Sequence, residues 1–202
     1  DDQVAVYLAD VSGHGASSAF ITILLKGMIA KYTMQYHAKH DDTILNPSKL
    51  MAAVSDEFFV AKLGKYLTLV YGVLNTKSGE FVYGIGGHYP NPILYKKDGS
   101  TKLLEGGGFP IGVKHGVEYQ AQQIKLLPGE HIVMFSDGVM EVFMPGHNLT
   151  QKEEGLLAAV RMSKGDIGAL LRTCAVTTTT NKAQPDDITL LVLEHGSRVS
   201  TP

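Results

Sequence analysis

The chain has 202 residues, of which 44% are hydrophobic and 19% are charged, and this is the composition of an ordinary folded domain. A chain of this length buries roughly two-thirds of its unfolded surface, so its fold does not depend on disulfide bonds. Its 18 basic and 20 acidic side chains leave a net charge of -2, which gives no positive field for binding nucleic acid or an anionic membrane.

Cysteine usage and hydropathy predict a cytoplasmic protein. The single cysteine, Cys174, cannot form an intrachain disulfide bond, which favours a reducing compartment. The longest apolar stretch, Ala19–Ala30, is interrupted by Lys26 and is shorter than the about 20 residues that span a membrane. Because the chain starts at Asp1 and enters a strand-like segment at once, we interpret residues 1–202 as a single domain that is truncated at its N-terminus.

The N-terminal part of the chain predicts a strand and then a long helix. Apolar side chains occupy both alternating sets of positions in Val4–Asp10, as in a strand that is buried on both faces. A turn-like composition follows, and Ser17 or Ser18 is predicted to cap a helix over Ala16–Tyr36. The apolar residues that recur along this helix at an amphipathic spacing are Phe20, Ile23, Leu24, Gly27, Met28 and Tyr32.

A second helix is predicted over Pro47–Ala61. Asn46 is a favoured N-cap residue, and Pro47 suits the first helical position because no backbone donor is needed there. The residues that share one face of this helix are Leu50, Val54, Phe58 and Ala61.

The remainder of the chain is predicted to contain strands and then two helices. The strands are Tyr66–Asn75, Glu80–Ile85, Ile93–Lys97, Lys102–Leu104, Glu118–Leu126, His131–Ser136 and Ile188–Glu194. Lys77-Ser78-Gly79 predicts a turn after the first of these strands. Asp98-Gly99 predicts a hairpin, and Pro128-Gly129 predicts that the strands on either side of it pair with each other. The helices are near Lys152–Met162 and Ile167–Val176. Strands that cluster with helices grouped around them favour an α+β fold over regular βαβ alternation.

Acidic residues lie at the ends of three of the predicted strands. Asp10 ends the first strand, Asp137 follows another, and the pair Asp186-Asp187 precedes the last. Carboxylates that converge at one sheet edge repel each other unless a cation is present, and oxygen ligands select Mg²⁺ or Mn²⁺. Zinc is disfavoured because Cys174 has no cysteine partner and the histidines show no ligand spacing. The alternative interpretation is that each aspartate is only a turn residue.

Several segments, in chain order, resemble the signature motifs of one bacterial enzyme family. These segments are Ala9–Ala19 (ADVSGHGASSA), Thr68–Leu74 (TLVYGVL), Gly86–Pro92 (GGHYPNP), Gly108–Gly112 (GFPIG), Leu127–Glu130 (LPGE), Phe135–Glu141 (FSDGVME) and Pro185–Leu191 (PDDITLL). They resemble the motifs of bacterial PPM phosphatases, which are protein phosphatase 2C-like, of the SpoIIE/RsbU type. The resemblance extends over nearly the whole chain.

The resemblance implies a fold and a set of metal ligands. The implied fold is a PPM-type α-β-β-α sandwich, with two antiparallel sheets flanked by helices and two Mn²⁺ or Mg²⁺ ions at one edge. Asp10 is implied to bridge both ions, with the backbone carbonyl of Val11 as a further ligand. Asp137 and Asp186 are implied to bind one ion, and Asp187 to support the site or to contact a water on an ion. The family's remaining metal carboxylate belongs to a Gly-Gly-Asp segment that would precede Asp1.

The implied reaction is hydrolysis of a phosphoserine or phosphothreonine in a protein by a water that the ions activate. No side chain is firmly assigned as catalytic. His14 is a weak candidate for a general acid because histidine titrates near neutrality, and its alternative role is that of a turn histidine. Gly13 and Gly138 are implied to support the turns that follow Asp10 and Asp137. His88 is expected to have a structural role. The expected surface histidines are His115, His131, His147 and His195, and Cys174 is expected to be buried.

The resemblance also implies partners. The implied substrate is a phosphorylated regulatory protein, such as an anti-sigma-factor antagonist, and the implied neighbour in the parent chain is an upstream receiver or sensor domain, as in response regulators of the RssB kind. The helices over Ala16–Tyr36 and Pro47–Ala61 are expected to be a regulatory handle and a homodimer surface, and the alternative is that they only cover the core. Two alternatives remain: a catalytically degenerate adaptor that binds a partner protein, and a di-metal phosphohydrolase that acts on small molecules.

Overall fold

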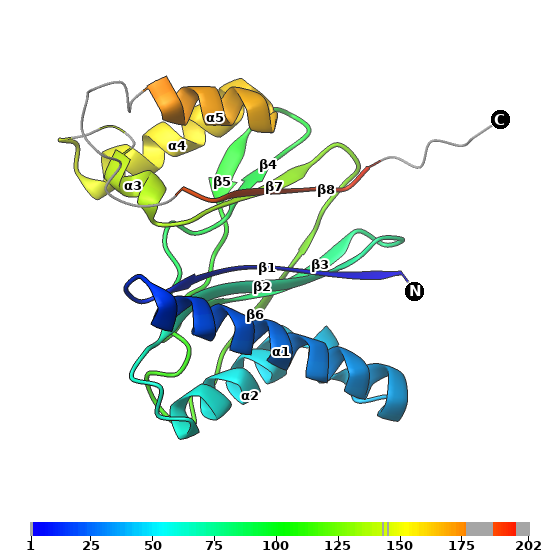
Figure 1. Ribbon diagram of the computed structural model, residues 1–202. Coiled ribbons are helices and arrows are strands. Elements are labelled where there is room, and N and C mark those ends of the chain that lie inside the picture. The colour runs from blue at the N-terminus through cyan, green and yellow to red at the C-terminus, as the bar shows by residue number, and fades with distance from the viewer. Residues whose placement is uncertain (1, 143, 145, 177–187, 197–202) are drawn as a thin grey trace. The chain divides into compact units, whose positions relative to one another are not determined.

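The computed structural model describes residues 2–142, 144, 146–176 and 188–196 (Figure 1). Its contacts divide the chain into two compact units. The first unit comprises Asp1–His88 and Gly106–Lys125, and the second comprises Tyr89–Glu105 and Leu126–Pro202. Among the described residues, no helix is both long enough and apolar enough to cross a membrane.

The first unit is built on a four-stranded antiparallel sheet in the order β1-β2-β3-β6 (Figure 1). Its strands are β1 (Gln3–Val11), β2 (Leu67–Asn75), β3 (Glu80–Gly86) and β6 (Ala121–Lys125). β1 and β2 pair along their whole length, from Gln3 opposite Asn75 to Val11 opposite Leu67. The predicted turn after β2 is confirmed, because the Asn75 carboxamide accepts hydrogen bonds from the amides of Lys77 and Ser78.

Two helices pack against this sheet, with a short 3-10 helix between them. They are α1 (Ala16–Lys39), η1 (Asp42–Leu45) and α2 (Pro47–Val60). The Asn46 side chain accepts a hydrogen bond from the Lys49 amide, which confirms the predicted cap of α2. Leu50, Val54 and Phe58 are buried, as predicted, and each contributes about 1.5–3 kcal/mol by burial. Ala61 follows the helix and is exposed, so its expected place on the buried face is wrong.

The buried face of α1 agrees with the prediction only in part. Tyr32 is buried and Met28 packs against the core, as predicted, but Ile21 and Leu25 are buried as well. Phe20 and Ile23, which were predicted on this face, are each 65% exposed. The helix carries two apolar stripes, and the i, i+4, i+11 series that starts at Ile21 packs on the sheet. The predicted serine cap is wrong as well, because Gly15 occupies the N-cap and no side-chain oxygen caps the helix.

The first strand is less buried than its sequence predicts. β1 lies at an edge of the sheet, and Leu8 is its only buried residue. Val4 is 44% exposed. An all-apolar strand was expected to be buried on both faces, but an edge strand has a neighbour on one side alone, so its first residues stay accessible to solvent.

The second unit is built on another four-stranded antiparallel sheet, in the order β5-β4-β7-β8. Its strands are β4 (Ile93–Tyr95), β5 (Thr101–Leu103), β7 (His131–Phe135) and β8 (Leu190–Glu194), and its helices are α3 (Gly138–Val142), α4 (Leu149–Ser163) and α5 (Ile167–Val176). The buried core residues of this unit include Ile93, Val133, Phe135, Leu156, Val160 and Leu170. The two antiparallel sheets and their helices confirm the predicted α+β class.

The expected pairing across Pro128-Gly129 is wrong. β6 pairs with β3 in the sheet of the first unit, whereas β7 pairs with β4 and β8 in the sheet of the second. The turn between them is formed, with the Glu130 amide donating to the Leu127 carbonyl, but it links two sheets instead of closing a hairpin. Pro-Gly favours a local turn, and the strand partners are chosen by long-range packing.

The caps of the two long helices in the first unit give a direct test. Replacing Asn46 with alanine removes the acceptor for the Lys49 amide, so we expect Asn46→Ala to lower the free energy of unfolding by about 1 kcal/mol in urea titrations. Ser17→Ala is the matched control, and we expect no loss because Ser17 is exposed and caps nothing. Equal losses in the two variants would contradict this description of the caps.

Candidate active site

Asp10 lies near the end of β1, directly before a tight turn into α1. Asp10 is opposite Thr68 of β2, and Val11 is opposite Leu67. The turn is bonded to the segment before β2, because the Ser12 amide donates to the Tyr66 carbonyl at 3.0 Å and the Tyr66 amide donates to the Ser12 hydroxyl at 3.2 Å. The carboxylate of Asp10 and the carbonyl of Val11 are therefore carried by a backbone that is fixed on both sides of the turn.

Lys65 holds the same turn from within. Its ammonium group donates to the Ser12 carbonyl at 2.8 Å and to the Ser18 hydroxyl at 3.2 Å. These charge-assisted bonds join the turn, the first residues of α1 and the segment that leads into β2. Nothing in the sequence marks Lys65 for this role, since it is an isolated lysine 53 residues after Ser12.

The position of Lys65 leaves no room for a side chain at Gly13. Gly13 has a φ of 75°, a conformation that favours glycine. A Cβ at this position would lie 2.8 Å from the Lys65 ammonium nitrogen, so a side chain there would displace the lysine. Gly13 thus leaves room for the Lys65 contact, and its role in supporting a metal site stays a prediction.

The histidines of the first unit differ in their surroundings. His14 is exposed in the turn. His88 is only 5% exposed, and its Nδ1 lies 3.4 Å from the Thr68 hydroxyl, which agrees with the expected structural role. His115 is exposed, as expected, and bonds to the Asp56 carboxylate at 2.9 Å.

Asp137 belongs to the second unit, between β7 and α3. Its carbonyl accepts the Met140 amide at 2.7 Å, and Gly138 is the first residue of the helix. The preceding residue, Ser136, exchanges two hydrogen bonds with Thr189, one from each backbone amide, at 3.0 and 2.8 Å. The start of the Asp137 turn is therefore fixed to the residue that precedes β8 within this unit.

Two of the expected surface histidines are half-buried. His131 packs at 5.6 Å from the Tyr95 ring, and His195 donates from Nδ1 to the Leu126 carbonyl at 2.7 Å. Burial follows from their places at the start of β7 and the end of β8, so the surface expectation is wrong for both. His147 is exposed, as expected, and the side chain of Cys174 lies outside the described residues.

The predicted metal ligands that the structure describes belong to different units. Asp10 and Val11 belong to the first unit and Asp137 to the second, whereas Asp186 and Asp187 lie outside the described residues. Within the described residues, no group of three or more His, Cys, Asp or Glu side chains gathers in a metal-binding arrangement. The predicted ligand atoms that the structure describes are carboxylate and carbonyl oxygens, which suit Mg²⁺ and Mn²⁺.

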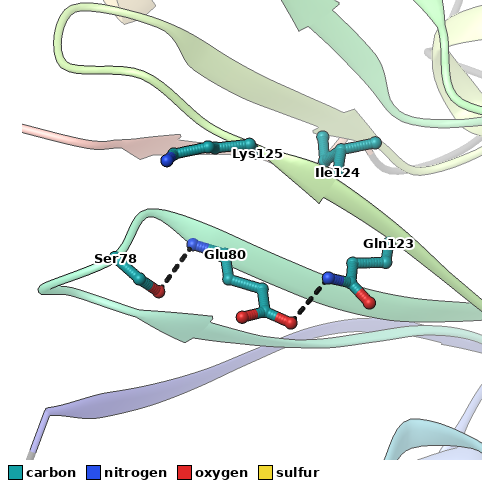
Figure 2. A pocket seen from close by; sticks show the side chains of 5 residues that line it. All are labelled: Ser78, Glu80, Gln123, Ile124 and Lys125. Carbon is teal, nitrogen blue, oxygen red and sulfur yellow. Dashed lines mark hydrogen bonds between the residues drawn. The ribbon is translucent and has the colours of Figure 1, made fainter.

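A hollow of about 280 Å³ lies beside β3 and β6, and hydrogen bonds join three of the residues that line it (Figure 2). The Ser78 hydroxyl accepts the Glu80 amide at 3.2 Å, and the Gln123 amide group donates to the Glu80 carboxylate at 2.6 Å. Because its carboxylate is engaged by the lining itself, we assign no chemistry to this hollow.

The family model for Stage II sporulation protein E (SpoIIE) matches residues 1–196 of the chain. The chain belongs to the SpoIIE family. This membership confirms the resemblance to SpoIIE/RsbU-type PPM domains that the motifs predict.

Individual members and neighbours of the SpoIIE family share sequence or fold with the chain. Phosphoserine phosphatase RsbU of Bacillus subtilis (strain 168) is 27% identical over 143 residues, which are 69% of this chain and 40% of RsbU. The structure of the RsbU and RsbW domains of Rv1364c from Mycobacterium tuberculosis has a TM-score of 0.77 at 26% identity, covering 96% of this chain and 52% of that one.

A more distant neighbour shares the fold alone. RsbX in complex with magnesium has a TM-score of 0.64 at 14% identity, covering 95% of this chain and 81% of that one. The structural neighbours confirm a PPM-type α+β fold for this SpoIIE family chain, which spans 40% of the length of RsbU.

The lysine contact in the Asp10 turn is open to a direct test. Lys65→Met removes the two hydrogen bonds that the ammonium group donates to Ser12 and Ser18. We therefore expect a loss of about 1.5–3 kcal/mol in the free energy of unfolding and faster hydrogen exchange over residues 12–18. Lys65→Arg keeps a charged donor and is expected to restore part of the protection.

The control for this test is Lys49→Met. Lys49 pairs with Asp42 on the surface, where such pairs contribute about 0–1 kcal/mol, so residues 12–18 should exchange as in the wild type. Unchanged exchange in Lys65→Met would show that the lysine does not hold the turn.

Proposed function

We propose that this chain is a metal-dependent phosphatase domain that hydrolyses phosphoserine or phosphothreonine in a protein. The observation that carries the proposal is the family match over residues 1–196, on a chain whose first motif forms a fixed turn at Asp10. RsbU, a phosphoserine phosphatase by name, supports the reaction class. RsbX, which has the same fold, has been solved with magnesium and supports a divalent cation as cofactor.

The proposed ligands are those that the resemblance implies. Asp10 and the Val11 carbonyl contribute oxygens from the first unit, and Asp137 and Asp186 contribute carboxylates from the second. Two Mn²⁺ or Mg²⁺ ions, when bound, would activate a water and stabilise the negative charge that develops on the phosphoryl group.

The chain's own residues keep those oxygens in place. Lys65 and the Ser12 contacts fix the backbone that carries Asp10, and the bonds between Ser136 and Thr189 fix the backbone before Asp137. Oxygens whose backbone is already fixed do not have to be ordered when a metal ion binds, which reduces the entropic cost of binding the ion. The proposal assigns no side-chain nucleophile. Asp187 is proposed to support the ligands, and His14 stays a weak candidate for a general acid.

The proposed substrate is a phosphorylated regulatory protein, such as an anti-sigma-factor antagonist, and the proposed location is the cytoplasm. RsbU extends well beyond the part that matches this chain, which supports an additional receiver or sensor domain in the parent protein. The structure of Rv1364c contains an RsbW domain beside its RsbU domain, which supports a place among regulators of this kind.

Metal-dependent turnover is the test of the reaction. In the full-length protein with Mn²⁺, we expect hydrolysis of p-nitrophenyl phosphate and of a phosphoserine peptide, and loss of both activities with EDTA. Asp137→Asn should lower kcat/KM at least about 100-fold, because a proposed ligand loses its charge. The matched control is Asp98→Asn, another Asp-Gly turn, in which the aspartate bonds to the Ser100 amide and the activity should stay unchanged.

Turnover of neither substrate by the full-length protein would contradict the phosphatase and favour the adaptor. Turnover of the aryl phosphate alone would favour a phosphohydrolase that acts on small molecules.

We also propose that the outer face of α1 contacts a second copy of the chain. Phe20, Ile23 and Met34 expose large apolar surfaces on this helix, and exposed apolar patches of this kind mark interaction sites. On the opposite side of α1, the Tyr32 hydroxyl donates to the Glu57 carboxylate of α2 at 2.5 Å. A displacement of α1 would therefore strain or break this contact with α2. The helix begins directly after the Asp10 turn, which links this face to the proposed ligands.

Paired substitutions on the two faces of α1 test this proposal. We expect Ile23→Ser to shift the sedimentation coefficient toward that of the monomer and to change phosphatase activity, with little change in Tm, because Ile23 is 65% exposed in its own unit. Ile21→Ser should lower Tm, since it places a hydroxyl in the core. An outer-face series that loses Tm and activity in proportion, with no change in sedimentation, would contradict the proposal.

A further inference from the structure

A second hollow of the first unit lies where α2 ends and β2 begins, and it is mostly apolar. It has a volume of about 450 Å³, and its apolar walls include Phe59, Leu63, Tyr66 and Val113. These side chains come from the end of α2, the loop before β2 and the loop after Gly112. Phe59, Tyr66 and Val113 are 42%, 47% and 46% exposed, so the hollow opens to solvent with its apolar lining accessible.

The shape of this hollow is built into the fold. Its base is the buried ring of Phe58, and Gly112 lies against it with a φ of 85°. A Cβ at Gly112 would be 2.9 Å from the Cβ of Phe58, so any side chain there would push the two walls apart. The Gly112 amide donates to the Ser55 hydroxyl at 3.0 Å, which fixes the loop to α2. The hollow is therefore a consequence of close packing rather than of a loose loop.

The charged residues that line the hollow are lysines, Lys62 and Lys65. A third, Lys114, directly follows the lining residue Val113, and its ammonium group lies 5.8 Å from the centre of the Phe109 ring. Within the part of the chain that the structure describes, no carboxylate lies within ion-pair distance of Lys62 or Lys114. Their ammonium groups are thus available to an external carboxylate.

The nearest acidic residues along α2 are already engaged. Asp56 accepts hydrogen bonds from His115 and from the Gly116 amide, at 2.9 and 2.8 Å. Glu57 accepts from Lys31 and Tyr32 of α1, at 2.6 and 2.5 Å. These two carboxylates bond to groups on other segments, and the charged side chains that line the hollow itself are Lys62 and Lys65, which favour an acidic ligand.

The hollow adjoins the turn that carries Asp10. Lys65 and Tyr66 line it, and the same two residues bond to Ser12. A ligand in the hollow therefore lies beside the segment of the first unit that holds the proposed metal-binding oxygens. An extended peptide that continues from the hollow would pass this turn.

We propose that this hollow, which we call the α2–β2 groove, docks a segment of the phosphoprotein substrate that carries acidic and large apolar residues next to the phosphorylated one. An apolar side chain enters between Leu63, Tyr66 and Val113, and carboxylates pair with Lys62 and Lys114. This inference rests on the proposed phosphatase function and adds to it the chemical class of the substrate segment. The groove supplies binding energy away from the reacting phosphate, which raises kcat/KM for the matching segment over others.

Matched peptides test the groove in the full-length protein with Mn²⁺. One set of phosphoserine peptides carries a leucine and two glutamates, placed before or after the phosphoserine, and the second set has glycine and serine at those positions. We expect kcat/KM for the better acidic peptide to exceed that of its neutral counterpart at least about ten-fold, which corresponds to about 1.4 kcal/mol. The unphosphorylated acidic peptide, labelled with a fluorophore, reports binding alone through its anisotropy.

Charge reversal locates the effect. Lys62→Glu and Lys114→Glu, two exposed positions, should each reduce the preference for the acidic peptide several-fold and weaken its binding in the anisotropy assay. Lys102→Glu makes the same charge change at an exposed site of the other unit and should leave the preference as in the wild type. Thermal unfolding of each variant shows that its fold is retained.

The outcomes separate this inference from the proposed reaction. Equal kcat/KM for acidic and neutral peptides would overturn the groove while the phosphatase stands, and so would a preference that survives both charge reversals. Absence of any phosphate hydrolysis, with anisotropy binding that Lys62→Glu weakens, would overturn the phosphatase and support the groove as a docking site. Absence of both hydrolysis and peptide binding would overturn both proposals.

Discussion

The charged contact in the turn between β1 and α1 is that of the Lys65 ammonium group, which donates to the Ser12 carbonyl. It adds to the two hydrogen bonds between Ser12 and Tyr66, in a turn after which α1 begins without a side-chain cap. The ammonium group of Lys65, which comes from the segment before β2, also donates to the Ser18 hydroxyl and so joins the turn to the first residues of the helix. The turn beside Asp10 is therefore held in part by a residue that is distant in sequence and lies in the segment before β2.

The same construction recurs in a different form in the second unit. There, the backbone before Asp137 is held by a pair of hydrogen bonds to Thr189, which belongs to the closing motif of the chain. In both units an aspartate lies at or directly after the end of a strand, and a residue in or beside the neighbouring strand fixes the turn. Motifs that lie far apart in the sequence are thus paired by strand neighbours, β1 with β2 and β7 with β8.

Sequence patterns predicted most elements because local chemistry determines them. The Asn46-Pro47 start of α2 and the turn after Asn75 follow from hydrogen bonds between neighbouring residues, and both were predicted from composition. The features that the sequence patterns predicted wrongly depend on long-range packing. The choice between two apolar stripes on α1, the edge position of β1 and the separate partners of β6 and β7 are decided by elements that a local pattern does not contain.

The candidate site divides in the same way. The aspartates and glycines were predicted because they belong to recognisable motifs, whereas Lys65 was not, since a single lysine before a strand has no distinguishing neighbour. The α2–β2 groove was missed for a related reason, because its lining comes from α2, the loop before β2 and the loop after Gly112, and no one segment shows the pattern. The groove and the turn share Lys65 and Tyr66, so substrate docking and the proposed metal ligands would depend on the same few contacts.

The most direct measurement of the central claim is calorimetric titration of the metal-free full-length protein with Mn²⁺. The account predicts that Asp10→Asn and Asp137→Asn each weaken Mn²⁺ binding at least about ten-fold while Tm stays near that of the wild type, and that Asp98→Asn binds as the wild type does. Wild-type Mn²⁺ affinity in either Asp10→Asn or Asp137→Asn would contradict the claim that these two turns exist to bind a divalent cation.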